Sequence, residues 1–143
     1  MEIRGFFRKE DNAAYVITTL LSKELNIHSP VRFLIDTGAS RTIISDMDAI
    51  KLGIDHSLLP RFKAVTAGIG GVVDTYFIQN VKSIFKTQEG AHVEKMEEIF
   101  VLKHKIRDER IKRIPSLLGR DILNRYQLLL DRRSNKVVIT DTL

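Results

Sequence analysis

Short runs of β-branched and apolar residues, separated by turn-forming residues, dominate the chain from residue 15 to residue 140. The runs YVITTLLS (15–22) and VRFLID (31–36) flank KELNIHSP, whose Asn and Pro favour a turn, so they predict two connected strands. Strand-like runs also lie on both sides of AGIGG within residues 61–87, which predicts a hairpin with a glycine-rich tip. The pattern is therefore typical of a mostly β fold.

One or two short helices are expected within this series of strands. Ser45 has the character of an N-cap, with Asp48 three residues later, and Gly53 directly follows the last periodic residue. These signals predict a helix over about 46–52. The first half of the chain therefore reads as strand, turn, strand, helix and hairpin.

The C-terminal half continues with short strands. A strand is expected around IFVL (99–102), and a shorter one within 114–118. A second helix is expected over about 120–126. The runs QLLLD (127–131) and KVVIT (136–140) are expected to pair across the turn RRSN.

The length of 143 residues and the hydrophobic content of 43% fit one domain over 1–143, with a core of about 15–140 and an N-terminal segment 1–14. No apolar run is long enough to span a bilayer, and the first residues lack the apolar region of a secretory signal, so a cytoplasmic protein is expected. The absence of cysteine excludes disulfides, thiolate catalysis and cysteine-bound zinc. The four histidines show no ligand spacing, so neither a metal nor a cofactor is expected.

The net charge of +5 raises the question of nucleic-acid binding, and KHKIRDERIKR (103–113) is the densest basic stretch. Asp108 and Glu109 interrupt that stretch, and no aromatic residue is interleaved for base stacking. A solvated surface segment explains it better, and the sequence argues against a nucleic-acid partner.

The carboxylate of Asp36 is the candidate for chemistry. It lies in FLIDTGASRTIIS (33–45), between two apolar runs and directly before a Thr-Gly pair. Asp-Thr-Gly can form a simple turn, since Asp bonds its own backbone and Gly supplies positive φ. A carboxylate in or beside a core is costly, however, unless several donors or a proton-sharing partner stabilise it.

Three motifs together resemble the retropepsin-like aspartic proteases: DTGAS (36–40), AGIGG (67–71) and LLGRDIL (117–123), in that order. The resemblance covers about residues 15 to 140 and implies a closed, barrel-like acid-protease fold. It also implies that Asp36 is catalytic and acts on peptides or unfolded proteins. Because the chain has a single Asp-Thr-Gly, it implies a homodimer in which two Asp36 side chains share a proton.

The resemblance assigns roles to the first motif. Thr37, Gly38 and Ala39 are expected to support the catalytic loop, with the Gly38 N–H donating to the carboxylate. Ala39 matches the viral relatives. It lacks the hydroxyl that the larger, two-lobed aspartic proteases place beside their catalytic Asp. Ser40 is expected to contact substrate, although many viral enzymes have an acid there that pairs with the arginine of the third motif.

The other two motifs receive roles in the same way. The second motif corresponds to the flap, in which the residue matching Ile69 contacts substrate through a water, with glycines on both sides: Gly68, Gly70 and Gly71. In the third motif, Leu118 and Gly119 are expected to pack against the catalytic loop, and Arg120 is expected to be a structural ion-pairing residue.

Two other functions remain to be weighed. A non-catalytic homodimer could keep the groove for peptide binding or assembly, but such a protein would not require the Asp-Thr-Gly together with the flap glycines. A phosphate-binding loop at AGIGG is disfavoured, because the spacing is wrong and a strand-like run follows it.

Overall fold

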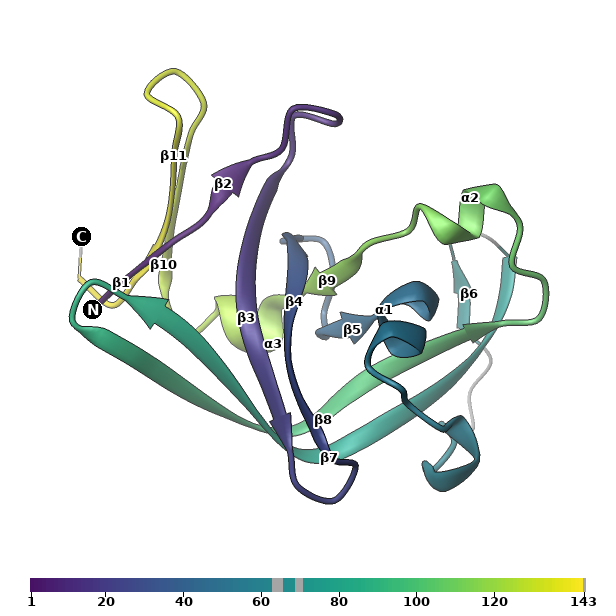
Figure 1. The fold of residues 1–143 in the computed structure, drawn as a ribbon. Coiled ribbons are helices and arrows are strands. Elements are labelled where there is room, and N and C mark those ends of the chain that lie inside the picture. Colours follow the sequence, from purple (N-terminus) through teal and green to yellow (C-terminus); the bar gives the residue numbers. More distant parts are fainter. Residues whose placement is uncertain (63–65, 69–70, 143) are drawn as a thin grey trace.

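The computed structural model describes residues 1–62, 66–68 and 71–142, and its strands join into one sheet (Figure 1). The strands are β1 (Glu2–Arg4), β2 (Phe6–Phe7), β3 (Ala14–Ser22), β4 (Ile27–Ile35), β5 (Ile43–Ile44), β6 (Thr66–Gly68), β7 (Gly71–Thr87), β8 (Gly90–His104), β9 (Ser116–Leu118), β10 (Gln127–Asp131) and β11 (Lys136–Thr140). The helices are α1 (Asp46–Lys51), the 3-10 turn η1 (His56–Leu58), α2 (Glu109–Lys112) and α3 (Arg120–Leu123).

The sheet closes on itself into a barrel. Neighbouring strands run in the order β7, β8, β5, β9, β4 and β3, and β3 pairs again with β7 through partners such as Thr18 and Phe85. Two of these contacts are parallel, β4 with β9 and β5 with β8. The mostly β, closed barrel-like fold predicted from the sequence is therefore confirmed.

Alternation along the strands fills the barrel, because successive side chains of a strand point to opposite faces. Along β3, Val16 and Leu20 are buried and Ile17 is exposed; along β4, Phe33 is buried and Arg32 is exposed. Side chains from all parts of the chain meet in one core cluster, which includes Ile44, Phe85, Ile99 and Ile122. Burying an aliphatic or aromatic side chain of this size stabilises the fold by roughly 1.5–3 kcal/mol.

The first helix forms as the sequence predicts. The Ser45 side chain caps α1 by accepting from the Asp48 N–H at 3.3 Å, and Gly53 follows the helix with φ of 70°. A residue with a side chain would be strained at that φ, so the glycine fits the end of the helix.

Other boundaries differ from the predictions. β4 begins at Ile27 and not at 31, because Asn26 takes the turn with φ of 53°. The second predicted helix is shorter, since α3 ends at Leu123. The turn η1 and the helix α2 lie where only loop was expected; α2 is capped by Asp108 and buries Ile111, which anchors the basic segment to the barrel.

Long hairpins extend from the barrel. β7 and β8 pair from Val73 opposite His104 to Thr87 opposite Gly90, so β8 starts well before the strand predicted at 99–102. They form the long curved ribbon in the lower part of Figure 1. The predicted pairing of QLLLD with KVVIT is confirmed, since β10 and β11 form an antiparallel hairpin.

The N-terminal segment also joins the sheet. β1 lies between β11 and β7, β2 pairs with β3, and Ile3 is only 2% exposed. The two ends of the described chain lie together (Figure 1), and the Met1 amine is 2.9 Å from a carboxylate oxygen of Asp141. Ile3 belongs to the core cluster, so the core begins earlier than residue 15. The sequence did not reveal this strand, because three residues are too few to show a periodic pattern. Over the described residues, no helix has the length and apolar character to cross a membrane.

Candidate active site

The Asp-Thr-Gly turn begins where β4 ends at Ile35. The Asp36 N–H donates to the Leu118 carbonyl of the parallel strand β9 at 3.1 Å, so β9 fixes the first residue of the loop. The Asp36 side chain is half-buried, while Thr37 and Gly38 are exposed. The sequence suggested a turn in or beside the core. In this chain the turn lies at the surface, because the loop leaves the barrel where the ladder with β9 ends.

The loop folds back on the Asp36 carboxylate. The Gly38 N–H donates to Asp36 Oδ1 at 2.9 Å, and the Ala39 N–H donates to the Asp36 carbonyl at 3.2 Å. A Cβ atom on Gly38 would lie 3.2 Å from the same carboxylate oxygen, so a side chain would crowd this bond. Within the described residues, the Gly38 N–H is the one donor to the carboxylate.

Arg120 holds the Asp-Thr-Gly loop in place through two hydrogen bonds. Its N–H donates to the Ala39 carbonyl at 2.9 Å, and its Nη1 donates to the Thr37 carbonyl at 2.8 Å. The sequence predicted an ion-pairing role for Arg120, but in the described part of the chain no carboxylate lies within ion-pair distance of it. Ser40, which the resemblance aligns with the acid of many viral enzymes, is exposed, and the guanidinium binds a backbone carbonyl.

Thr42 and Asp121 form a second link between the loop and α3, and sequence reasoning missed both. The Asp121 carboxylate accepts from the Thr42 N–H at 2.9 Å and from the Thr42 hydroxyl at 2.7 Å. Thr42 is 1% exposed, and its Oγ1 also accepts from the Gly119 N–H at 3.2 Å. The two residues are 79 positions apart, and neither stands out in the sequence; the one signal was the position of Asp121 within LLGRDIL.

Gly119 lies where two backbones pass each other. A Cβ atom there would be 2.5 Å from the backbone carbon and oxygen of Arg41, a distance at which no side chain fits. Leu118, which precedes it, is 1% exposed and packs in the core behind the loop. The first and third motifs are therefore in direct contact.

The glycine-rich hairpin is described in part. β6 and β7 are antiparallel, with Gly68 opposite Gly71, and β6 pairs with β7 alone, off the main path of the sheet. Ile69 and Gly70, which the sequence assigned to the tip, lie outside the described residues. In the described chain, no hydrogen bond joins Gly68 or Gly71 to the Asp-Thr-Gly loop.

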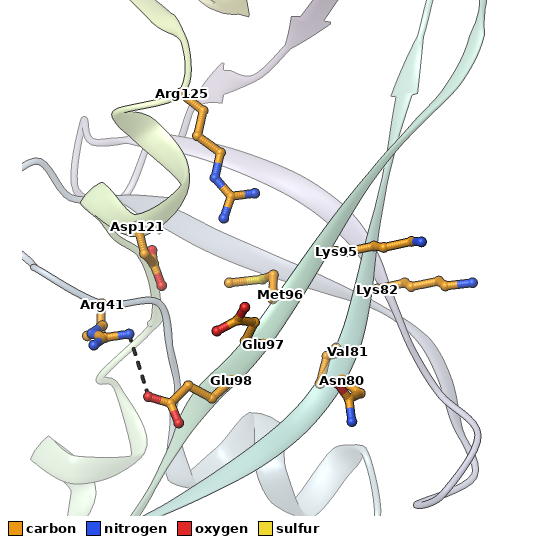
Figure 2. Close-up of a pocket in the computed structure, with 10 residues that line it drawn as sticks. All are labelled: Arg41, Asn80, Val81, Lys82, Lys95, Met96, Glu97, Glu98, Asp121 and Arg125. Carbon is orange, nitrogen blue, oxygen red and sulfur yellow. Dashed lines mark ion pairs between the residues drawn. The ribbon is translucent and has the colours of Figure 1, made fainter.

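A pocket of about 740 Å³ adjoins Arg41, just after the Asp-Thr-Gly loop (Figure 2). Arg41, Asp121 and Arg125 line one side, and the middle of β7 and β8 lines the other. Arg41 pairs with Glu98 of β8 at 3.6 Å, the dashed line in Figure 2, and Met96 is buried between the two sides. The pocket has charges of both signs and does not include Asp36.

The described residues contain no group of three or more histidine, aspartate or glutamate side chains that could hold a metal ion. The reactive group that the geometry presents is one half-buried carboxylate on a tightly bonded loop. A carboxylate of this kind can accept or donate a proton, and a second acid beside it would let the two share one proton.

A profile of the family described as "gag-polyprotein putative aspartyl protease" matches residues 22–125, well over half of the chain. The match includes all three motifs: the Asp-Thr-Gly loop, the glycine-rich hairpin and the segment LLGRDIL behind the loop.

Two solved structures share the fold. A retropepsin-like aspartic protease from Rickettsia conorii superposes with a TM-score of 0.58 and 20% identity, covering 97% of this chain and 89% of that one. The EIAV protease in complex with an inhibitor superposes with a TM-score of 0.50 and 21% identity, covering 86% of this chain and 98% of that one. At these identities the likeness concerns the fold alone, and the retropepsin-like fold expected from the sequence is confirmed.

Proposed function

The chain belongs to the gag-polyprotein aspartyl protease family, and from this premise we propose that it is an aspartic endopeptidase that acts as a homodimer. One observation carries the proposal. Asp36 stands at the surface end of β4 on a loop held by β9 and α3, yet its carboxylate receives one hydrogen bond from the described chain. The loop is held in place by its backbone bonds, while the Asp36 side chain is half-exposed. A side chain that has to meet both a partner subunit and a substrate needs this combination.

Hydrolysis of a peptide without a metal or a covalent nucleophile needs one group that takes a proton from water and another that gives a proton to the carbonyl oxygen. Two carboxylates in contact do both, since like charges so close do not both ionise and the pair keeps one proton. In our proposal the two acids are Asp36 of each subunit. They titrate as a unit, so their pKa values belong to the pair.

The neighbouring residues support this dyad in the proposed mechanism. Thr37 bonds across the two-fold axis, while Gly38 and Ala39 shape the loop. Ser40 and the hairpin glycines (Gly68, Gly70 and Gly71) contact an extended substrate along with Ile69, in the manner of strand addition. Leu118, Gly119 and Arg120 hold the loop in place from behind.

An exposed strand edge supports association of two copies. In the described part of the chain, β10 pairs with β11 and stands at one end of the strand order. Leu129 and Leu130 on this strand are 36% and 48% exposed. An apolar edge of this kind favours pairing with another chain, and we propose that it forms part of the dimer surface.

The test compares the wild type with Asp36→Asn on an unfolded protein substrate at about pH 5, with sedimentation of both proteins. We expect the variant to lose activity by about 10²–10⁴-fold or more while remaining a dimer. Asp108→Asn is a matched control, because Asn caps a helix about as well as Asp and α2 should be unaffected. If neither the wild type nor Asp36→Asn cleaves while both are folded dimers, the protease function is refuted and the non-catalytic peptide-binding function takes its place.

A mixing experiment addresses the shared site directly. In an equilibrated equal mixture of wild type and Asp36→Asn, only about one quarter of the dimers carry two Asp36 side chains. Activity should therefore fall to about one quarter of that of the same total amount of wild type, whereas independent subunits would keep about one half. The activity of the wild type should have a bell-shaped pH profile that peaks at about pH 4–6.

A further inference from the structure

A basic groove lies away from the catalytic loop, on the outer side of β3 and β4. It has a volume of about 700 Å³ and is closed by α1 and by the segment 112–115 that leads into β9. We use the name basic groove for this site, whose cationic residues are Arg8, Arg32, Lys51, Lys112 and Arg113. They come from four separate stretches of the chain, and only the fold brings them together.

The groove has a strong excess of positive charge. Its lining contains one carboxylate, Asp48, and that group accepts a hydrogen bond from the Ser116 hydroxyl, which is fully buried. Gathering like charges destabilises a folded chain unless an anion compensates them. The basic groove is therefore an electrostatic match for a negatively charged partner.

Three of the five cations have no carboxylate partner among the described residues. Arg8 pairs with Asp11 at 2.7 Å, and Lys112 pairs with Glu109 at 3.3 Å. For Arg32, Lys51 and Arg113, no carboxylate of the described chain lies within ion-pair distance. These three are exposed, and the Arg32 guanidinium is held 5.5 Å from the centre of the Tyr15 ring.

The surface between these cations is aliphatic. Ile17, in the middle of β3 and opposite Arg32 in the ladder, is 52% exposed. Pro30, Ile114 and Pro115 also line the groove. The lining residues include no aromatic ring on which a nucleic-acid base could stack. An acidic peptide, which carries carboxylates and aliphatic side chains, fits this combination better than a nucleic acid, which carries phosphates and bases.

We propose that the basic groove binds an acidic polypeptide segment, in which glutamate or aspartate alternates with aliphatic side chains. The carboxylates would pair with Lys51, Arg32 and Arg113, and the aliphatic side chains would cover Ile17. The groove is connected to the catalytic loop by the chain itself, since Pro115 precedes β9 and the Leu118 carbonyl binds the Asp36 N–H. If the proposed protease function holds, the basic groove selects substrates that carry an acidic segment at a distance from the cleavage site.

Binding is tested with Asp36→Asn as the parent protein, so that cleavage plays no part. The probe is a fluorescein-labelled peptide of alternating glutamate and leucine, followed by fluorescence anisotropy. Adding Lys51→Glu and Arg113→Glu should weaken binding by at least about tenfold, because two cations become repulsive. The matched control adds Lys82→Glu and Lys95→Glu, an exposed cross-strand pair outside the groove, and should change affinity by less than about twofold.

Several results would overturn the proposal. If both double variants weaken binding equally, only the net charge matters and the groove is not a site. If a peptide with glutamine in place of glutamate binds as tightly, the carboxylates are not recognised. If an oligothymidylate of equal charge binds more tightly, and loses affinity in the Lys51→Glu, Arg113→Glu protein, the groove is a nucleic-acid site.

The link to catalysis is measured separately, in proteins that keep Asp36. The Lys51→Glu, Arg113→Glu variant should lower kcat/KM for a substrate with an appended acidic segment by about tenfold, and leave the same substrate without that segment unchanged. A loss on both substrates would contradict selection by the groove. An inactive wild type would refute the proposed protease function and leave the binding result as measured.

Discussion

Two aspartates, Asp36 and Asp46, lie ten residues apart, and each comes shortly after a strand that ends in isoleucine. Their surroundings in the fold are opposite. Asp36 is half-buried and accepts a hydrogen bond from Gly38. Asp46, the first residue of α1, is 2% exposed and accepts from the His104 N–H at 2.7 Å, from His104 Nδ1 at 2.6 Å and from Arg107 Nε at 3.3 Å. The acid that is removed from water is the one with several donors within the chain.

This difference distinguishes a structural carboxylate, Asp46, from a carboxylate that stays accessible to a partner or a substrate, Asp36. A buried carboxylate costs several kcal/mol unless donors or an opposite charge compensate it, and Asp46 has both. The Asp36 loop is also held in place, but through its backbone: Arg120 binds two carbonyls of the loop, and β9 accepts its first N–H. The backbone is held while the side chain stays accessible, as the proposed dyad requires.

The largest effect on stability is expected at Asp46. Asp46→Asn should lower the free energy of unfolding by about 3 kcal/mol, because the amide removes the charge and turns an NH₂ group toward buried donors. Asp36→Asn should lower it by less than about 0.5 kcal/mol, since the altered group lies at the surface. Urea unfolding of both variants at one chain concentration measures the difference. Equal losses would show that Asp36 is also a structural acid.

Local signals explain what the sequence predicted of the fold and of this site. The Asp-Thr-Gly loop, the Ser45 cap and the turn between β10 and β11 all depend on residues within a few positions of one another. Asp46 is different, because its partners His104 and Arg107 come from the far end of β8 and the loop after it. No local pattern reveals contacts over such a separation, and the same is true of the bond between Thr42 and Asp121.

Smaller elements were missed for a related reason. β1 has three residues and one buried side chain, Ile3, which is too little for an alternating pattern. α2 lies in a stretch read as solvated because of its charges, although Asp108 three residues before buried Ile111 was an available N-cap signal. The many charged residues around Ile111 masked the pattern of its single buried side chain.

An intermediate effect is expected at Thr42, which tests whether the accessible loop owes its rigidity to contacts behind it. Thr42→Val keeps the shape of the side chain but removes the hydroxyl between Asp121 and the Gly119 N–H. The free energy of unfolding should fall by about 1–2 kcal/mol, measured by urea unfolding. In the proposed enzyme, kcat should fall more than KM rises, because the loop and not the substrate contact is disturbed.

Thr87→Val is the matched control for that substitution. Thr87 is the last residue of β7 and only partly buried, and valine is favoured in strands, so stability should stay within about 0.5 kcal/mol of the wild type. If Thr42→Val were as mild as the control, the link between α3 and the loop would contribute nothing to holding Asp36.

The smallest effect concerns His56, which reports on the charge of Asp46. His56 is buried in η1, its ring lies edge-on to Tyr76 at 5.1 Å, and burial lowers its pKa below the ordinary value of 6.5. Lys103 and Arg107 lower this pKa further, while a backbone hydrogen bond to Leu102 and the negative charge of Asp46 raise it. The folded chain therefore binds the proton less readily than the unfolded chain. Stability is retained above about pH 6.5 and declines as the pH falls toward the pKa of the folded state.

Proton NMR titration of the His56 ring, assigned with His56→Phe, should give a midpoint below 6.5 in the wild type. Asp46→Asn should lower that midpoint further, because it removes a carboxylate charge that favours the protonated ring. Asp36→Asn should leave it unchanged, since no interaction joins that loop to His56 in the described chain. A midpoint that responded to Asp36 and not to Asp46 would reverse the assignment of the two acids, making Asp36 the one coupled to the interior of the fold.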